Sequence, residues 1–244
     1  MVADGDRASA RAAAIRSLIA GAPGAPGHAG LLGRVCLVAA RELAALGAAV
    51  TVLTGDGLRG LSAASDPVIE RLEELQFTLG EGPCIDAIES RRPVLIADLS
   101  GPAMSRWPAY APAVREGGVG AVFAFPLQVG AARLGMLDVF RRQPGPLSEA
   151  ELEIALHLAD ATVEGLLDRQ EEEGRRGDTD GLAWDVGNRA QLYQAQGMVM
   201  IQLGIALDEA LVRMRAYAFA EDRRLDDVAR DIVNRTLRFD LDTP

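Results

Sequence analysis

Arginine side chains able to contact phosphate groups are concentrated near the end of the 244-residue chain. They are Arg213, Arg215, Arg223, Arg224, Arg230, Arg235 and Arg238. Carboxylates alternate with them, so residues 183–244 hold eight arginines against ten acidic residues and carry a net charge of −2. Two interpretations stay open: a nucleic-acid surface, whose affinity depends on phosphate contacts, or a solvated surface with ion pairs four residues apart.

Cys84 is a second candidate for chemistry, because it follows Gly82-Pro83 at the start of an expected helix. A helix N-terminus lowers the pKa of a thiol, so redox sensing or covalent ligand attachment is an alternative to a packed, structural cysteine. Only one other cysteine, Cys36, is present, which is too few for a disulfide framework or a zinc site. The sequence shows no metal-ligand cluster, phosphate loop or catalytic triad, so we predict no catalytic residue, no metal ligand and no enzyme.

Three short helices are expected to position the arginines. Apolar residues recur at helical spacing in three stripes, and Gly204 lies where the first helix should end. The stripes are Leu192-Ala195-Val199-Leu203, Ala210-Leu211-Met214-Ala218 and Leu225-Val228-Ala229-Ile232-Val233. Each helix is too short to be stable alone, so the stripes should pack together as a three-helix bundle.

The order YQAQGMVM…LG…DEA…MR…A…L…VA over residues 184–239 resembles the ANTAR domain, the RNA-binding module of bacterial transcription antiterminators. The resemblance implies binding of tandem RNA stem-loops in mRNA leaders. The expected RNA contacts are Gln194, Gln196, Arg213, Arg215, Tyr217, Arg223 and Arg224. Many members carry lysine where this chain has Gln196, so one phosphate-facing cation is expected to be missing. Unpaired bases could stack on Tyr193, Tyr217 or Phe219, although such rings also serve as core or dimer contacts.

The preceding part of the chain has the pattern of an α+β domain. Helices are expected over residues 31–46, 67–77, 84–90 and from Ser148 onward, where Ser148 and Glu151 form a capping box. Strands are expected over 49–53, 58–62, 93–97, 120–129 and 132–141, with an Asp56-Gly57 hairpin turn. The sheet should therefore be built largely from hairpins.

Three segments of this body resemble a GAF domain, a sensory domain related to PAS. They are LGEGPC at 79–84, RRPVLIADL at 91–99 and FPLQV…LGMLDVF at 125–140. The resemblance implies a small-molecule pocket between the sheet and residues 79–110. The expected lining is Cys84, Trp107, Phe123 and Phe125 with Arg106 as an anchor; core packing is the alternative for the two phenylalanines. The identity of the ligand stays open, and so does whether the chain holds any cofactor.

The composition limits the class of protein. The net charge of −10 argues against a membrane surface or nonspecific nucleic-acid binding by the whole molecule. No apolar run reaches 18 residues and no signal-peptide core is visible near Met1, so we expect a cytoplasmic protein.

We therefore expect a flexible N-terminal arm (1–29), a GAF sensor (30–168), a connector (169–182), an ANTAR bundle (183–240) and a tail (241–244). The Ala/Arg-rich start of the arm could be helical, up to the break at residues 21–27. The chain is interpreted as a homodimeric, signal-responsive antitermination regulator. One apolar stripe on the helix that begins at Ser148 could pack against a helix of a second subunit as well as against the sheet. Its residues are Leu152, Ala155, Leu156, Ala159, Val163 and Leu166. The alternatives are a bundle that mediates dimerisation or binds a protein partner without RNA, a thiol redox sensor using Cys84, and a DNA-binding helix-turn-helix, which the acidic third helix disfavours.

Overall fold

The computed structural model describes the chain over residues 2–23, 30–53, 59–176 and 183–240. Side chains are described for residues 9–23, 30–53, 63–168 except Met104, and 191–240. The chain divides into two compact units, one of residues 1–76 and 81–172 and one of residues 77–80 and 173–244.

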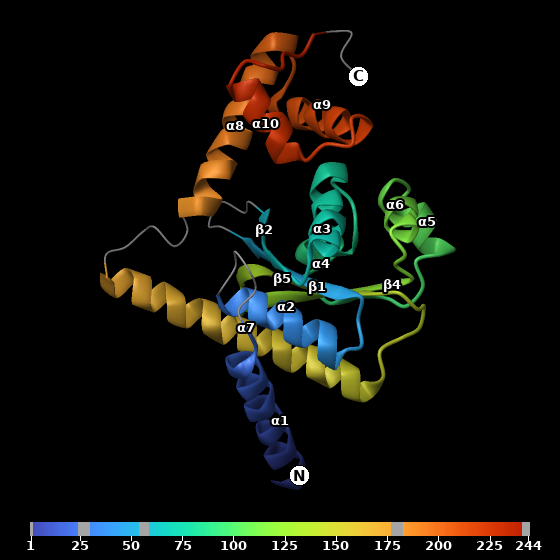
Figure 1. Cartoon of the computed structure of the whole chain (residues 1–244), viewed down its shortest axis with the longest axis vertical. Coiled ribbons are helices and arrows are strands. Elements are labelled where there is room, and N and C mark those ends of the chain that lie inside the picture. Colours follow the sequence, from blue (N-terminus) through green and yellow to red (C-terminus); the bar gives the residue numbers. More distant parts are fainter. Residues whose placement is uncertain (1, 24–29, 54–58, 177–182, 241–244) are drawn as a thin grey trace. The chain divides into compact units, whose positions relative to one another are not determined.

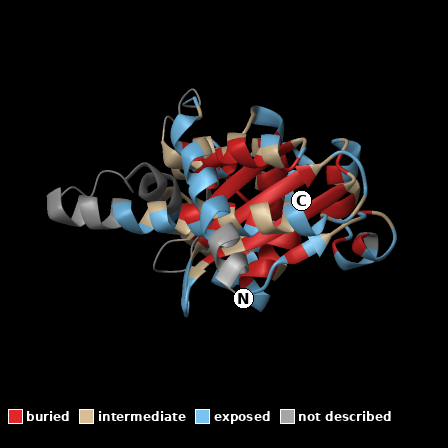
Figure 2. Cartoon of the chain, turned by 90° about the horizontal axis from the view of Figure 1, so that it is seen from below, coloured by how far each residue is buried: buried red, intermediate tan, exposed pale blue. Residues whose placement is uncertain are grey.

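The first unit is built on a five-stranded antiparallel sheet of order β2-β1-β5-β4-β3. The strands are β1 (Gly47–Leu53), β2 (Arg59–Ala64), β3 (Val94–Ile96), β4 (Ala121–Val129) and β5 (Ala132–Arg141). The central strands are mostly buried (Figure 2). Both faces of β5 are therefore covered, although side chains alternate between the faces along a strand.

Two sets of helices cover the two faces of the sheet (Figure 1). The helices α2 (Leu31–Glu42) and α7 (Glu149–Arg176) pack on one face, through a core that includes Val38, Phe123, Val139 and Leu158. Helices on the opposite side are α3 (Pro67–Leu79), α4 (Pro83–Ser90), α5 (Pro102–Arg106) and α6 (Tyr110–Glu116). The α+β prediction is confirmed, whereas α5 and α6 were not expected from the sequence.

The N-terminal residues differ from the expected flexible arm. Residues 2–21 form the helix α1 (Val2–Gly21), whose Ile15 and Ile19 are buried in the core beside α2 and α7. Ion pairs of α1 with Glu153 and Glu164 of α7 add to this contact. The arm prediction is thus wrong for residues 2–21, because apolar burial fixes this helix; residues 24–29 lie outside the described part of the chain.

Helix α7 begins at the predicted capping box and continues into the expected connector. Glu151 Oε2 accepts hydrogen bonds from the Ser148 N–H (2.7 Å) and hydroxyl (2.8 Å). The helix reaches Arg176, so residues 169–176 of the connector are helical. Most of the apolar stripe of α7 packs on its own sheet, and Leu156 remains 43% exposed. The predicted turn at residues 54–57 and the tail at 241–244 lie outside the described residues.

The second unit contains the predicted three-helix bundle, formed by α8 (Ala183–Leu203), α9 (Leu207–Ala220) and α10 (Leu225–Val233). Its core holds all three predicted stripes and Phe239, which follows α10. Gly204 ends α8 with a φ of +68°, a left-handed conformation that glycine adopts without strain. Ala206 precedes α9 and provides no side-chain cap, because a methyl group cannot accept a hydrogen bond from the first backbone N–H groups of the helix.

In the described segments, no single helix is long and apolar enough to cross a membrane. Two consecutive helical segments, residues 191–203 and 207–220, are together long and apolar enough, but the chain bends by 101° between them.

Candidate functional site

A cluster of buried polar side chains occupies the face of the sheet that carries α3, α4 and α6. Thr51 of β1 and Asp138 of β5 project from the sheet, while Glu73 comes from α3 and Cys84 from α4. All four side chains are fully buried. One donor atom each of Glu73, Cys84 and Asp138 lies within 4.8 Å of the other two. We call these three residues, with Thr51, Gln76 and Tyr110, the polar cluster.

Hydrogen bonds hold Glu73 at the centre of the polar cluster. Its carboxylate accepts from the Thr51 hydroxyl (3.0 Å) and from Gln76 Nε2 (2.8 Å). Gln76 in turn accepts from the backbone N–H of Cys84 (2.8 Å), which ties α3 to the start of α4. By contrast, neither carboxylate oxygen of Asp138 has a nitrogen or oxygen hydrogen-bond partner among the described residues, although the Cys84 thiol is close enough to affect its pKa.

Burial changes the protonation of both acids. Desolvation raises the pKa of Glu73 to about 7, although hydrogen bonds from Thr51, Gln76 and Cys84 oppose the shift. The pKa of Asp138 is also raised well above its ordinary value, first by burial and then by the negative charge of Glu73. Two carboxyl groups this close and this deeply buried favour their neutral forms.

Tyr110 adds a phenol at the edge of the polar cluster. Glu81 accepts hydrogen bonds from the backbone N–H groups of Ala109 (2.7 Å) and Tyr110 (2.8 Å), which fixes the start of α6. The Tyr110 ring packs edge-on against Trp107, with centroids 6.4 Å apart. Its Oη is buried and finds no hydrogen-bond partner in the described part of the chain, and burial followed by the charges of Glu73 and Asp138 raises its pKa.

The structure brings together only part of the predicted ligand site. Cys84 and Trp107 lie on the polar-cluster side, but Phe123 and Phe125 project into the core under α2 and α7. Placing the phenylalanines in the same pocket was wrong, because odd-numbered residues of β4 point to the other face of the sheet. Arg106 is also not a buried anchor: it stacks on Trp107 (4.8 Å to the ring centroid) and pairs with Asp86 (2.5 Å) at the surface.

Sequence reasoning missed Glu73, Asp138, Thr51, Gln76 and Tyr110. Two signals for the acids were nevertheless present. Glu73 falls on the apolar face of α3 with Ile69, and Asp138 interrupts an apolar strand. An acid at a core position is rarely left there without a partner.

The raised pKa of Glu73 predicts that the first unit loses stability as pH rises. Glu73 keeps its proton in the folded state up to about pH 7, whereas in the unfolded chain it ionises near 4.5. Its contribution is complete below pH 4.5 and is lost as pH rises to about 7; the loss is roughly 3 kcal/mol from 1.36 kcal/mol per pKa unit. We expect Glu73→Gln to remove this loss, since the uncharged amide could accept from Gln76 and donate to Thr51.

Urea unfolding near pH 5.5 and pH 8, between which about 2 kcal/mol of this loss should occur, checks this prediction. Unfolding is followed by Trp107 fluorescence in a Trp184→Phe background. The other titratable groups that interact electrostatically with Glu73 are Asp138, Cys84 and Tyr110, together with Cys36 on the α2 side of the sheet. Asp138 therefore leaves a dependence of the same sign in the variant. Glu89→Gln, at an exposed site on α4, is the matched control. Equal pH dependence in wild type and Glu73→Gln would contradict the assignment.

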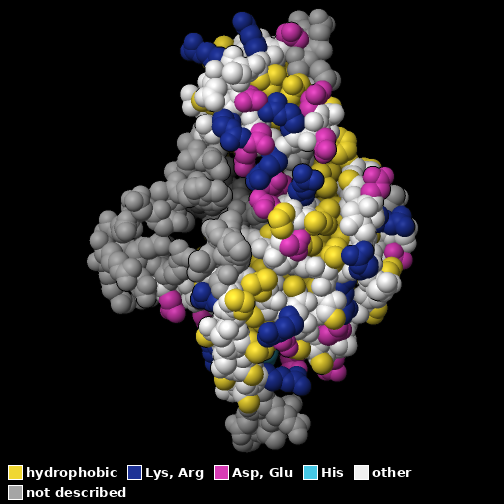
Figure 3. Space-filling view, in the orientation of Figure 1, with side chains coloured by type: hydrophobic (Ala, Val, Ile, Leu, Met, Phe, Trp, Pro, Cys, Tyr) yellow, Lys and Arg dark blue, Asp and Glu magenta, His cyan; other side chains and the backbone are white. Residues whose placement is uncertain are grey.

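The second unit presents a surface on which arginines and carboxylates interleave (Figure 3). Ion pairs join Arg223 to Asp231 (2.5 Å) and Arg230 to Asp227. The bond to Asp231 is the main cause of a raised pKa of Arg223. In residues 191–240, Arg213, Arg235 and Arg238 are exposed and have no carboxylate partner. These three, which we call the open arginines, are the guanidinium groups best placed to bind an external phosphate.

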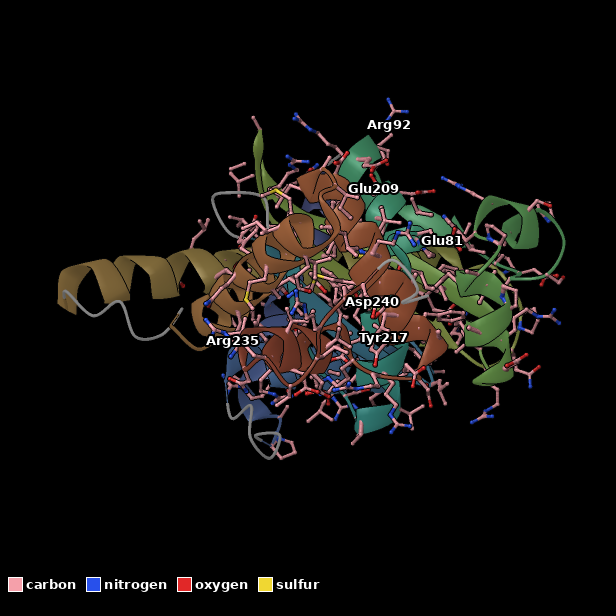
Figure 4. All side chains as sticks on the ribbon, turned by 90° about the horizontal axis from the view of Figure 1, so that it is seen from above. Glu81, Arg92, Glu209, Tyr217, Arg235 and Asp240 are labelled. Atoms are coloured by element: carbon pink, nitrogen blue, oxygen red, sulfur yellow. The ribbon has the colours of Figure 1, made fainter. Side chains whose placement is uncertain are left out.

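The remaining predicted RNA contacts are divided between surface and interior. Gln194 and Arg224 are exposed, whereas Arg215 is half-buried. Tyr217 is also half-buried; its ring packs against Phe239, with centroids 5.3 Å apart, and Figure 4 places it apart from Arg235. Tyr217 therefore belongs to the packing of the bundle.

Gln196 does not face a phosphate. It is 6% exposed, and its Nε2 donates a 2.6 Å hydrogen bond to the carbonyl of Leu207. This bond joins α8 to the first turn of α9. The expectation that Gln196 replaces a phosphate-facing cation is therefore corrected: in this bundle the position lies at a helix–helix contact.

Two family models match the chain. The one described as GAF domain matches residues 29–166, and the one described as ANTAR domain matches residues 184–233. No curated protein gives a match.

Solved structures resemble the first unit at low identity. The GAF domain of a phosphoenolpyruvate-protein phosphotransferase from Coxiella burnetii is 17% identical, with a TM-score of 0.51, over 68% of this chain and 96% of that one. The corresponding Acinetobacter domain is 15% identical (TM-score 0.47; 69% and 98% covered). Free methionine-R-sulfoxide reductase from Neisseria meningitidis is 13% identical (TM-score 0.46; 68% and 93% covered). At these identities the likeness concerns the fold alone.

Proposed function

We propose that this chain, which belongs to the GAF domain family and carries an ANTAR domain, is a signal-responsive transcription antitermination regulator. The observation that carries the proposal is the ANTAR match at residues 184–233, on a folded three-helix bundle. ANTAR domains bind RNA and GAF domains can bind small ligands. Both are regulatory or sensor domains, and we assign no reaction to the chain.

The open arginines support a role in RNA binding despite the net charge of −2 over residues 183–244. Arg213 lies on α9, and Arg235 and Arg238 follow α10. Each can form charge-assisted hydrogen bonds to a phosphate without breaking an internal ion pair. Recognition of an RNA loop depends less on total charge, because unpaired bases stack on exposed rings. Tyr193 and Phe219, which are 45% and 48% exposed, are such rings.

The target that we propose is a pair of stem-loops in an mRNA leader, bound by a homodimer. Two bundles in one dimer would contact two hairpins at once, and linked contacts raise the overall affinity. The exposed apolar side chains Leu156 and Leu167 of α7 are candidates for the dimer contact. Light scattering tests the proposed dimer. A monomer at working concentration, with and without RNA, would contradict the dimer and leave the proposal of RNA binding unaffected.

A signal bound by the GAF domain can alter the bundle only if it binds two arrangements of the chain with different affinity. The polar-cluster side of the sheet is where we place the sensory site. Its three acid and thiol groups come from separate elements, α3, α4 and β5. A change at the polar cluster would therefore move several elements together.

Transcription through a terminator tests the proposed function directly. The template carries tandem stem-loops that overlap an intrinsic terminator, and a matched template carries scrambled loops. We expect the full chain to increase read-through on the first template only. Unchanged read-through, in the presence of folded protein that binds the hairpins, would show that binding does not cause antitermination.

A second candidate function is binding of a protein partner by the bundle. It is favoured by exposed apolar side chains, Ile201 at 77%, Val212 at 59% and Phe219 at 48%. Such residues are common at protein interfaces when they form a patch. This candidate predicts no salt-dependent RNA affinity, and replacing Ile201 and Val212 by serine would abolish partner binding without affecting any RNA contact.

A further inference from the structure

The polar cluster contains a set of donor atoms that sequence reasoning did not predict. Glu73, Cys84 and Asp138 are separated by up to 65 positions, but the fold places one donor atom of each within 4.8 Å of the others. They come from a helix, a helix N-terminus and a central strand, which are rigid elements. A sulfur and two carboxylate oxygens that converge in this way resemble the ligands of a transition-metal ion.

Unsatisfied groups around the donors also point to a ligand. Within the described residues, neither carboxylate oxygen of Asp138 has a nitrogen or oxygen hydrogen-bond partner, although the side chain is fully buried. Tyr110 Oη is likewise buried without a partner there, and burial, followed by the charges of Glu73, Asp138 and Cys84, raises its pKa. An unsatisfied polar group in the interior destabilises the fold, so a bound cation would relieve several such costs together.

We propose that Glu73, Cys84 and Asp138 bind one divalent transition-metal ion of the zinc type. The donor types select the ion: a thiolate disfavours magnesium and calcium, and two carboxylates disfavour copper(I). Tyr110 Oη or a water molecule is the candidate fourth ligand. Thr51 and Gln76 already hold the Glu73 carboxylate, as residues that orient metal ligands do.

Only small movements would be needed to complete the site. Bonds of about 2.0 Å to oxygen and 2.3 Å to sulfur place tetrahedral donors about 3.3–3.5 Å apart. The observed donors are within 4.8 Å of one another, so they must approach by at most about 1.5 Å. Side-chain rotation can supply this distance.

Cobalt(II) is the probe for the experiment, because a thiolate bound to it gives a charge-transfer absorption band. The full chain is first stripped with a chelator and then titrated with Co²⁺ and, in competition, with Zn²⁺. We expect one Co²⁺ per chain, a thiolate band, and loss of that band on adding one equivalent of Zn²⁺. The assay contains no RNA, so its result is independent of the antitermination proposal.

Three variants separate the site from other modes of binding. Cys84→Ala should abolish the band, and Asp138→Asn should weaken Co²⁺ binding at least tenfold. Cys36→Ala should leave both unchanged, because the Cys36 thiol donates to the Ala63 carbonyl (3.6 Å) and lies outside the donor set. Circular dichroism verifies that each variant is folded. If Cys84→Ala unfolds, the nearly isosteric Asp138→Asn tests the site by its weaker Co²⁺ binding. A folded wild type without the band, or a band that persists in Cys84→Ala, overturns the proposal.

Discussion

Replacing Phe239 by alanine is expected to unfold the α8–α10 bundle. Phe239 lies beyond the ANTAR match, which ends at residue 233, but it is only 1% exposed. Its ring packs on Tyr217, and its backbone N–H donates to Gln202 Oε1 (2.9 Å). Truncating a buried phenylalanine to alanine costs about 3–5 kcal/mol. A domain of this size is stabilised by only about 3–9 kcal/mol, so the loss removes at least a third of that stability and unfolds the bundle if its stability lies in the lower half of this range.

Amide hydrogen exchange of the full chain measures this effect, because it reports on each domain separately. We expect protection to disappear over residues 191–233 in Phe239→Ala and to remain over the strands of the GAF domain. Arg238→Ala, at the exposed neighbouring site, is the control and should preserve protection. A chain ending at Val233 should behave like Phe239→Ala, and a chain ending at Asp240 like wild type. Full protection in the chain ending at Val233 would show that residues 234–239 do not stabilise the bundle.

Reversing the charge of the open arginines is expected to lower RNA affinity by about a thousandfold. Arg213→Glu, Arg235→Glu and Arg238→Glu together remove three phosphate contacts and add three repelling carboxylates. A tenfold loss per contact corresponds to about 1.4 kcal/mol, hence about 4 kcal/mol in all. The slope of log affinity against log salt should also become shallower by about 2–3, because fewer counterions are released on binding.

A matched triple variant distinguishes local from global charge. Arg92, Arg115 and Arg142 are exposed in the GAF domain, and Figure 4 shows Arg92 extending from the surface. Replacing these three by glutamate changes the net charge of the chain by the same amount. Filter binding should show near wild-type affinity for this control. Equal losses in the two triple variants would mean that total charge, and not the open arginines, determines RNA binding.

Much of the fold followed from local patterns in the sequence. The capping box at Ser148, the helix end at Gly204 and the hairpin of β4 and β5 each depend on residues close together in the chain, and all three were predicted. The burial of α1 could not be predicted in this way. Its Ile15 and Ile19 are covered by distant elements, and an alanine- and arginine-rich helix gives only a weak apolar stripe.

The candidate site residues could be predicted from the sequence only where their role requires nothing more than an exposed side chain. Arg213 lies at the surface, where an RNA contact requires it to be, whereas Gln196 joins two helices within the bundle. The polar cluster depends on a sheet register that places Asp138 opposite Ala49 and on α3 packing over Thr51. Neither contact has a signature in the one-dimensional pattern, although an acid within an apolar strand indicated that Asp138 needed a partner.

The central claim is that the bundle binds RNA stem-loops. The most direct measurement is a titration of the full chain against an RNA with two tandem stem-loops, beside a loop-scrambled control, at several salt concentrations. The account predicts tighter binding to the intact loops, and an affinity that falls as salt increases and as the open arginines are reversed. Equal affinity for both RNAs at low salt, with the bundle shown to be folded by amide exchange, would contradict it and favour a protein partner.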